Sequence, residues 1–189
     1  MCSSDLKTPH TEYLLSLLDQ YFKMAVLSRG YKRKSNGFIL ANQDSTPDHI
    51  GDEPKQIDIK FPNVKVAVDG NRVRGIKLLQ EKVKNLNAII LDDAFQHRYV
   101  DAGLKILLTP YDKLYIDDFF LPTGSLRESK SGSKRADIIV VTKTSKLLSP
   151  LERRMVRTKL SPQPYQKVFF SYYHYNDFVP LFKKNKRKY

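Results

Sequence analysis

The stretch AIILDD (residues 88–93) decides the fold that we predict for this chain. Four apolar residues in succession are too few for a helix and indicate a strand that is buried on both faces. Similar apolar runs occur at residues 24–27, 64–68, 104–108, 138–141 and 168–172, with a shorter one at 38–41. Because helix-like segments separate these runs, we predict an α/β fold with a mostly parallel sheet between layers of helices.

Helical patterns occur in three of the intervening segments. Residues 7–22 and 72–86 have apolar side chains at spacings of three and four. The sequence Ser-Pro-Leu-Glu at 149–152 combines a capping serine, a proline suited to the first turn and a glutamate that completes a capping box. We therefore expect a helix from there to Leu160. The polar stretches 42–54 and 109–134 are expected to be loops, the second with a short helix.

Composition limits the classes of protein that need to be considered. The 189 residues suffice for one domain, and a hydrophobic content of 41% excludes a disordered chain. No apolar run approaches the roughly 18 residues that suggest a membrane span. The single cysteine, Cys2, excludes an internal disulfide. A net charge of +13 favours anionic partners, which include nucleic acid, phospholipid head groups and phosphorylated substrates.

Candidate site residues follow the apolar runs, because ligands of parallel sheets bind beyond the carboxyl ends of the strands. Arg29 and Arg72 follow two of these runs, and Asp92 and Asp93 follow residues 88–91. Cations together with an acid pair suit phosphate groups and Mg²⁺. The acid pair has the pattern of a Walker B strand, in which a carboxylate binds magnesium. The alternative is an aspartate that caps the next helix.

Three further features have both a functional and an ordinary interpretation. Lys7-Thr8 opens the first helix as in a phosphate-binding loop, yet no glycine-rich turn precedes it, so an ordinary helix start is the alternative. The acidic turn GDEP (51–54) is either a simple turn or the source of a general base. His97 lies near the acid pair, but no second histidine or cysteine stands at the spacing of a zinc site.

The segments LSRGYKRKSNGF (27–38), GDEP (51–54), LDDAFQHR (91–98) and LPTGSLRES (121–129), in this order, resemble the tetraacyldisaccharide 4'-kinase family of lipid A biosynthesis. The similarity extends from Lys7 to Phe182. It implies a P-loop NTPase-like three-layer sandwich. It also implies a membrane-associated kinase that transfers the γ-phosphate of ATP to the 4'-hydroxyl of a tetraacyldisaccharide 1-phosphate, giving lipid IVA, with Mg²⁺ as cofactor.

The resemblance implies roles for individual residues. Asp52, Asp93 and Arg127 match catalytic positions, with Asp52 helping to activate the sugar hydroxyl. Thr8, Asp92 and Asp93 match the ligands of magnesium. The positions that match nucleotide- or substrate-binding residues are Lys7, Thr8, Arg29, Glu53, Arg72, Gln96 and His97.

The chain departs from the family pattern at both ends. Residues 1–6 do not look like family sequence and lack the glycines of the phosphate loop, and no C-terminal lobe follows Phe182. We therefore expect a non-family start at 1–6, a partial P-loop kinase domain at 7–182 and a basic tail at 183–189. We also expect little activity from the chain as given. The resemblance further implies a monomer bound peripherally to the anionic cytoplasmic face of the bacterial inner membrane, without nucleic acid.

Two other functions remain open. The sequence VTKTS (141–145) superficially resembles the guanine-reading motif of a GTPase, although Ser145 stands where an aspartate is expected. A different P-loop enzyme, either a GTPase or a small-molecule kinase, is therefore the first alternative. The second is a basic nucleic-acid-binding module, because the +13 charge and the 11 tyrosines are suited to phosphate contacts and base stacking.

Overall fold

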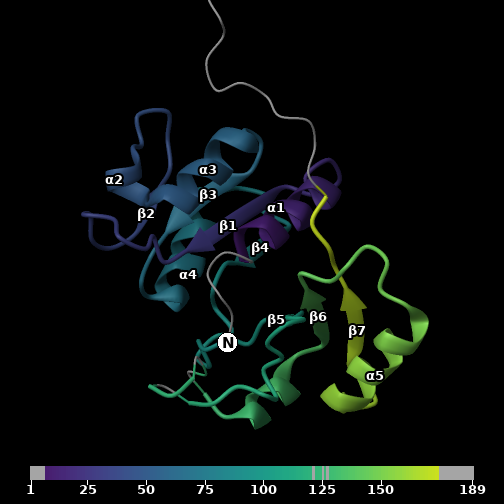
Figure 1. The fold of residues 1–189 in the computed structure, drawn as a ribbon. Helices are drawn as coiled ribbons and strands as arrows, with labels where there is room; N and C mark the ends of the chain where they lie inside the picture. The colour runs from purple at the N-terminus through teal and green to yellow at the C-terminus, as the bar shows by residue number, and fades with distance from the viewer. Residues whose placement is uncertain (1–6, 121, 125, 127, 175–189) are drawn as a thin grey trace, which may run out of the picture.

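The computed structural model describes residues 7–120, 122–124, 126 and 128–174, and these ranges contain two sheets (Figure 1). The first has the order β2-β3-β1-β4 and the second β5-β6-β7. The strands are β1 (Met24–Ser28), β2 (Ile39–Leu40), β3 (Lys65–Val68), β4 (Ala88–Leu91), β5 (Ile106–Pro110), β6 (Ile138–Thr142) and β7 (Lys167–Phe170). All neighbouring strands are parallel except β2, which is antiparallel to β3. The predicted α/β class with mostly parallel strands is confirmed, but the strands form two sheets rather than one.

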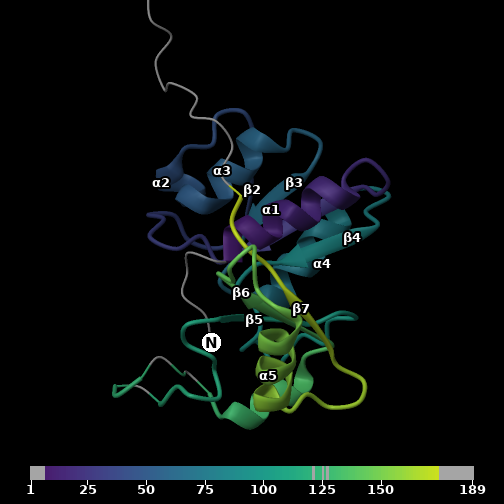
Figure 2. The ribbon, with the colours of Figure 1, turned by 45° about the vertical axis from the view of Figure 1, so that its right-hand side comes forward.

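Helices cover both faces of the first sheet (Figures 1 and 2). Met24 and Val26 of β1 pack in one core with α1 (Lys7–Leu18) and α3 (Asp52–Lys60), whereas Ala25 and Leu27 pack in another with α4 (Arg72–Lys82). Successive side chains of a strand point to opposite faces, so a strand covered on both faces must be apolar throughout. The strand β1 is buried along its whole length, as expected for the central layer of a three-layer arrangement.

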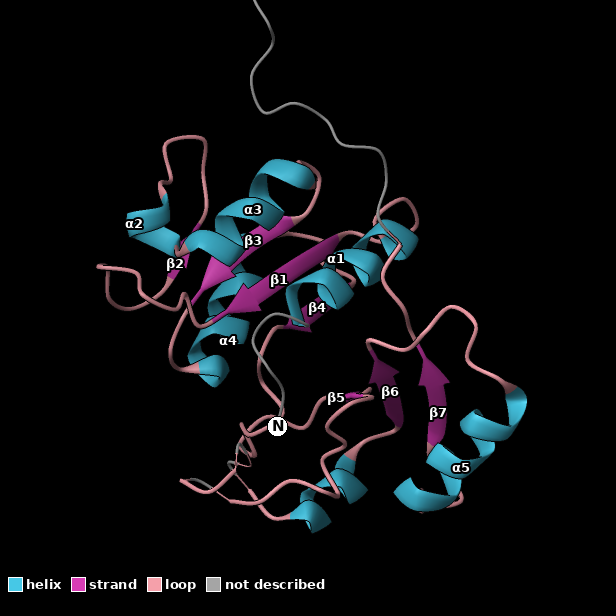
Figure 3. Cartoon of the chain, viewed as in Figure 1, coloured by secondary structure: helices cyan, strands magenta, loops and turns pink. Residues whose placement is uncertain are grey.

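The second sheet has its own core. Ile139 and Val141 of β6 pack against Val156 and Leu160 of α5 (Pro150–Leu160), and Figure 3 shows this helix beside β7. The predicted capping box begins the helix. Ser149 Oγ accepts a hydrogen bond from the backbone N–H of Glu152 at 3.2 Å, and the backbone N–H of Ser149 donates to Glu152 Oε2 at 2.8 Å.

The helix predicted at residues 7–22 ends early. It stops at Leu18, and Tyr21 and Phe22 lie exposed in the turn that follows, without a core to extend the apolar face. The helix predicted at 72–86 likewise ends at Lys82.

The loop predicted at residues 42–54 is wrong in part. Residues Pro47–Ile50 form the short helix α2, and α3 begins at Asp52 after Gly51. The buried residues of α3 are Pro54 and Ile57 alone, so its apolar periodicity is too weak to recognise in the sequence. Within the second expected loop, Lys130–Arg135 forms the predicted short helix, of the 3-10 type. None of the helices in the described ranges is both long and apolar enough to cross a bilayer.

We predict that Ile139→Ala lowers the free energy of unfolding by about 2–5 kcal/mol, because a fully buried side chain is replaced by a cavity. Thermal or urea unfolding measures this loss. Leu147→Ala is the matched control, since Leu147 is 88% exposed, and we expect it to change stability by less than about 0.5 kcal/mol. Equal losses in the two variants would contradict the assignment of the second core.

Candidate functional site

The carboxyl ends of β1, β3 and β4 meet at one edge of the first sheet because these strands are parallel. The ladder continues beyond the strands. The N–H of Asp69 donates to the carbonyl of Ser28 at 3.0 Å, and the N–H of Asp92 donates to the carbonyl of Leu27 at 3.1 Å. Residues that follow the three strands are therefore side by side, as the position of the apolar runs predicts.

The acid pair lies at this edge. Asp92 is 4% exposed, whereas Asp93 is exposed and has a backbone φ of 50° in the left-handed region. Lys7, the first residue of α1, donates from Nζ to Asp93 Oδ1 at 2.5 Å. The structure thus brings together two segments, Lys7-Thr8 and the end of β4, that are more than 80 positions apart in the sequence.

Thr8 and Glu53 complete the acidic side of the site. The hydroxyl of Thr8 is buried and makes no hydrogen bond of ordinary geometry within the described part of the chain. It lies beside the carboxyl of Glu53, the second residue of α3. Burial raises the pKa of Glu53, and the nearby charge of Asp92 raises it further, while Lys7 opposes the shift. The carboxyl of Glu53 therefore lies within the electrostatic influence of Lys7, Asp92 and Asp93.

The acidic side has an excess of negative charge. Burial raises the pKa of Asp92, and so does the adjacent charge of Asp93, against the opposing effects of Lys7 and Arg72. A hard cation would relieve this repulsion, and the carboxylates of Asp92 and Asp93 with the buried hydroxyl of Thr8 are the oxygen donors that Mg²⁺ prefers. The described residues contain no group of three His, Cys, Asp or Glu side chains arranged around one point. Mg²⁺ at phosphate sites needs only one or two carboxylates, so these residues fit it.

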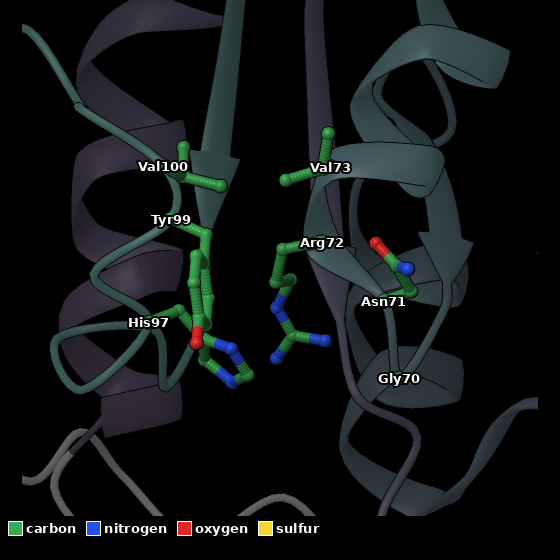
Figure 4. A pocket seen from close by; sticks show the side chains of 7 residues that line it. All are labelled: Gly70, Asn71, Arg72, Val73, His97, Tyr99 and Val100. Carbon is green, nitrogen blue, oxygen red and sulfur yellow. The ribbon is translucent and has the colours of Figure 1, made fainter.

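Cationic groups lie on the other side of the acid pair. Arg72, the first residue of α4, is 2% exposed and donates from Nη2 to the carbonyl of Asp92 at 3.1 Å. Burial lowers the pKa of His97, and the charges of Arg72 and Arg29 lower it further. The neutral form of the His97 imidazole is therefore favoured, and Figure 4 shows it facing the guanidinium of Arg72.

A pocket of about 510 Å³ opens between the start of α4 and the loop after β4. Figure 4 shows the side chains of His97 and Tyr99 on one side of it and that of Arg72 on the other. Its full lining is Gly70, Asn71, Arg72, Val73, His97, Tyr99 and Val100. Of these lining residues, the sequence identified only Arg72 and His97. The others lie in the segments that follow β3 and β4, and this position was the available signal.

The remaining predicted residues lie at or near this edge, or outside the described part. Asp52 is exposed at the start of α3. It follows Gly51, which has a φ of 92° and whose missing Cβ would lie 3.1 Å from the carbonyl oxygen of Tyr31, so glycine is needed there. Gln96 is half-buried in the turn before His97. Arg127 lies outside the described residues.

These groups are arranged to handle a polyphosphate. A lysine at a helix start, two carboxylates and a hydroxyl suit the metal-bound end of a nucleotide, because oxygen ligands hold Mg²⁺ and a cation neutralises the phosphates. The arginines and His97 on the far side of the acid pair suit a second anionic group. The edge therefore has the composition of a phosphoryl-transfer site.

Known proteins are similar to this chain in sequence. The family model for tetraacyldisaccharide-1-P 4'-kinase matches residues 4–175. The tetraacyldisaccharide 4'-kinase of Flavobacterium johnsoniae is 53% identical over 182 residues, which cover 96% of this chain and 53% of that protein. The enzyme of the same name from Bacteroides thetaiotaomicron is 50% identical over 177 residues, covering 93% of this chain and 47% of that protein. The chain thus spans about half the length of these relatives.

A solved structure is similar as well. The crystal structure of LpxK from Aquifex aeolicus in complex with ATP superposes with a TM-score of 0.68 and 27% sequence identity, over 98% of this chain and 72% of that one. Because the family match covers most of the sequence, the chain belongs to the tetraacyldisaccharide 4'-kinase family.

Proposed function

We propose that this chain contains the phosphoryl-transfer site of a kinase that moves the γ-phosphate of ATP to the 4'-hydroxyl of a tetraacyldisaccharide 1-phosphate, giving lipid IVA. The observation that carries the proposal is the convergence of Lys7 and Thr8 on Asp92 and Asp93 at the carboxyl edge of a parallel sheet. The relatives of this name and the ATP complex of the similar structure support it.

The phosphates of ATP bind to one group of residues, which consists of Lys7, Thr8, Asp92 and Asp93. Thr8, Asp92 and Asp93 would hold Mg²⁺, and the ion would supply positive charge to neutralise the phosphates. The ion pair with Asp93 orients the ammonium group of Lys7 toward the same place. Such positioning and charge neutralisation are most of what phosphoryl transfer requires.

Asp52 and the residues around the pocket handle the acceptor. The carboxylate of Asp52 accepts the proton of the sugar hydroxyl as the bond to phosphorus forms, and Glu53 beside it contributes to nucleotide binding. Arg29, Arg72 and His97 line the cationic side of the site, which suits an anionic group of the acceptor. We assign Gln96 to the same binding surface, and we assign Arg127 a catalytic role. The net charge of +13 suits a peripheral position on the anionic cytoplasmic face of the bacterial inner membrane, where we place the chain as a monomer.

Transfer of radiolabelled phosphate from ATP to the disaccharide acceptor in detergent micelles tests the proposal. Protein in excess over acceptor allows even slow transfer to be detected. We expect labelled lipid with ATP and much less with GTP. A preference for GTP would favour the GTPase alternative, and RNA binding without any transfer would favour the nucleic-acid-binding one.

We predict that Asp52→Asn lowers the rate of transfer by about 10²- to 10⁴-fold with little change in nucleotide binding, because the amide cannot accept the hydroxyl proton. Single-turnover kinetics measure the rate, and a fluorescent ATP analogue measures binding. Asp48→Asn is the matched control, since Asp48 is an exposed aspartate nearby that pairs with Lys34. An unchanged rate in Asp52→Asn would remove Asp52 from the mechanism.

The raised pKa of Asp92 predicts a conflict between binding and stability. The folded protein takes up the proton of Asp92 more readily than the unfolded chain, so stability falls as the pH rises from the unfolded pKa through the folded one. Asp92→Asn removes this loss. We expect it to stabilise the metal-free protein at pH 7 by about 0.5–2 kcal/mol and to flatten this part of the pH dependence.

Thermal unfolding with and without Mg²⁺ and ATP measures both effects. The ligands should raise the melting temperature of the unchanged chain and leave that of Asp92→Asn almost unaltered, because binding to the folded state stabilises it. If Asp92→Asn proves less stable than the unchanged chain in metal-free buffer at pH 7, the assigned charge excess is wrong.

A further inference from the structure

Asp69 is a fully buried carboxylate at the edge of the sheet to which no role has been given above. It directly follows β3. Its Oδ1 accepts hydrogen bonds from the backbone N–H of Asn71 at 2.9 Å and from Arg74 Nη2 at 2.8 Å, and its Oδ2 accepts one from Arg74 Nε at 2.8 Å. Both oxygens are therefore bonded, and the pair with Arg74 is the two-pronged arrangement that fixes geometry most firmly.

These bonds fix the turn between β3 and α4. The side chain of Asn71 caps α4 by accepting from the backbone N–H of Arg74 at 3.0 Å. One turn into the helix, Gly75 lets α4 approach closely: a Cβ there would lie 2.8 Å from Leu27 Cδ2 and 3.1 Å from Asp69 Cβ. The start of α4 is thus held against β1 and against Asp69 itself.

Arg72 projects from this fixed turn across the strand ends. Its Nη1 donates to the carbonyl of Asp69, which follows β3, and its Nη2 donates to the carbonyl of Asp92, which follows β4. Since β1 lies between β3 and β4 in the sheet, the guanidinium of Arg72 links two strand ends that are not neighbours. Together with the bond from the N–H of Asp92 to the carbonyl of Leu27, it holds the backbone of Asp92 in place.

We propose that Asp69 is a positioning residue for phosphoryl transfer, which acts through Arg74 and Arg72 to set the position of the metal-binding carboxylate of Asp92. This inference rests on the proposed function. Asp69 does not touch the substrate in this scheme. Its carboxylate holds the turn, the turn directs Arg72, and Arg72 holds the backbone from which the side chain of Asp92 extends.

Asp69→Asn tests the chain of contacts with almost no change in volume. The NH₂ group of asparagine cannot accept from Arg74, although the remaining oxygen can, so one of the two bonds of the pair is lost and the turn is loosened. Arg74→Ala and Arg74→Lys test the other partner. The side chain of Arg74 is half-exposed, so these variants remain informative should Asp69→Asn fail to fold. Lysine keeps the charge but not the paired donors, so it should restore part of the function.

Glu12→Gln is the matched control. Glu12 is also a nearly buried carboxylate with two partners, since it accepts from Gln56 Nε2 at 2.7 Å and from Lys60 Nζ at 2.6 Å. It lies between α1 and α3, on the opposite face of the sheet from α4. The control therefore removes a comparable interaction without altering the turn after β3.

The measurement is Mn²⁺ binding in the presence of ATP, followed by electron paramagnetic resonance, with no lipid acceptor so that no turnover occurs. We expect Asp69→Asn and Arg74→Ala to weaken Mn²⁺ binding by about 10- to 100-fold, as for other residues that orient metal ligands. Arg74→Lys should fall between these variants and the unchanged chain. Glu12→Gln should bind as the unchanged chain does, even where it lowers the melting temperature.

The other outcomes distinguish failure of this inference from failure of the proposed function. Unchanged Mn²⁺ binding in Asp69→Asn shows that Asp69 does not position the site. An equal loss in Glu12→Gln shows a general effect of lost stability. Failure of the unchanged chain to bind Mn²⁺ with ATP overturns the proposed function as well. Normal Mn²⁺ binding without transfer to the disaccharide overturns the proposed acceptor and leaves the role of Asp69 intact.

Discussion

The structure of the candidate site depends on the burial of one negative charge, the carboxylate of Asp92. Taking a carboxylate out of water beside a second one is costly unless cations and hydrogen bonds compensate. Lys7 and Arg72 provide part of this compensation, yet the pKa of Asp92 is still raised. The cations of the protein therefore do not fully neutralise the negative charge of the acid pair. A divalent cation with oxygen ligands would neutralise it. Binding capacity and folded stability are opposed at this residue.

The sequence predicts the elements that carry continuous apolar runs or helix caps, but not how deeply each is buried. Residues 88–91 were expected to form a strand buried on both faces, whereas β4 lies at the edge of its sheet and is only partly buried. The bounds of β4 agree with residues 88–91, and the capping box of α5 is as expected, because continuous apolar runs and caps are local signals. The helix α3 was missed because it buries only two of its nine residues. The division into two sheets could not be foreseen, since strand pairing depends on contacts between segments that are distant in the sequence.

For the site, sequence patterns identify individual residues better than they identify bonds. The position of Asp92 and Asp93 after an apolar run was sufficient to select them, and the structure places Lys7 beside them. By contrast, the sequence does not indicate that two nitrogens of Arg72 donate hydrogen bonds to backbone carbonyls. The sequence predicted that Arg72 binds substrate. In the structure, its buried Nε is the nitrogen that makes no hydrogen bond in the described part of the chain. Such a distribution of donors is set by tertiary packing alone.

The loop that follows β4 is held by arginines from both halves of the structure. Arg72 donates to the carbonyl of Asp92, and Arg135 donates to the carbonyl of Phe95 at 3.1 Å while its guanidinium lies 4.9 Å from the ring of Phe95. Arg135 is itself fixed by Glu128, at 2.9 Å from both carboxylate oxygens. Backbone carbonyls accept these bonds whatever side chain is present, so the path of the loop is imposed by its surroundings. The helix α4 and the 3-10 helix Lys130–Arg135, which flank different sheets, therefore both hold the loop that carries the acid pair.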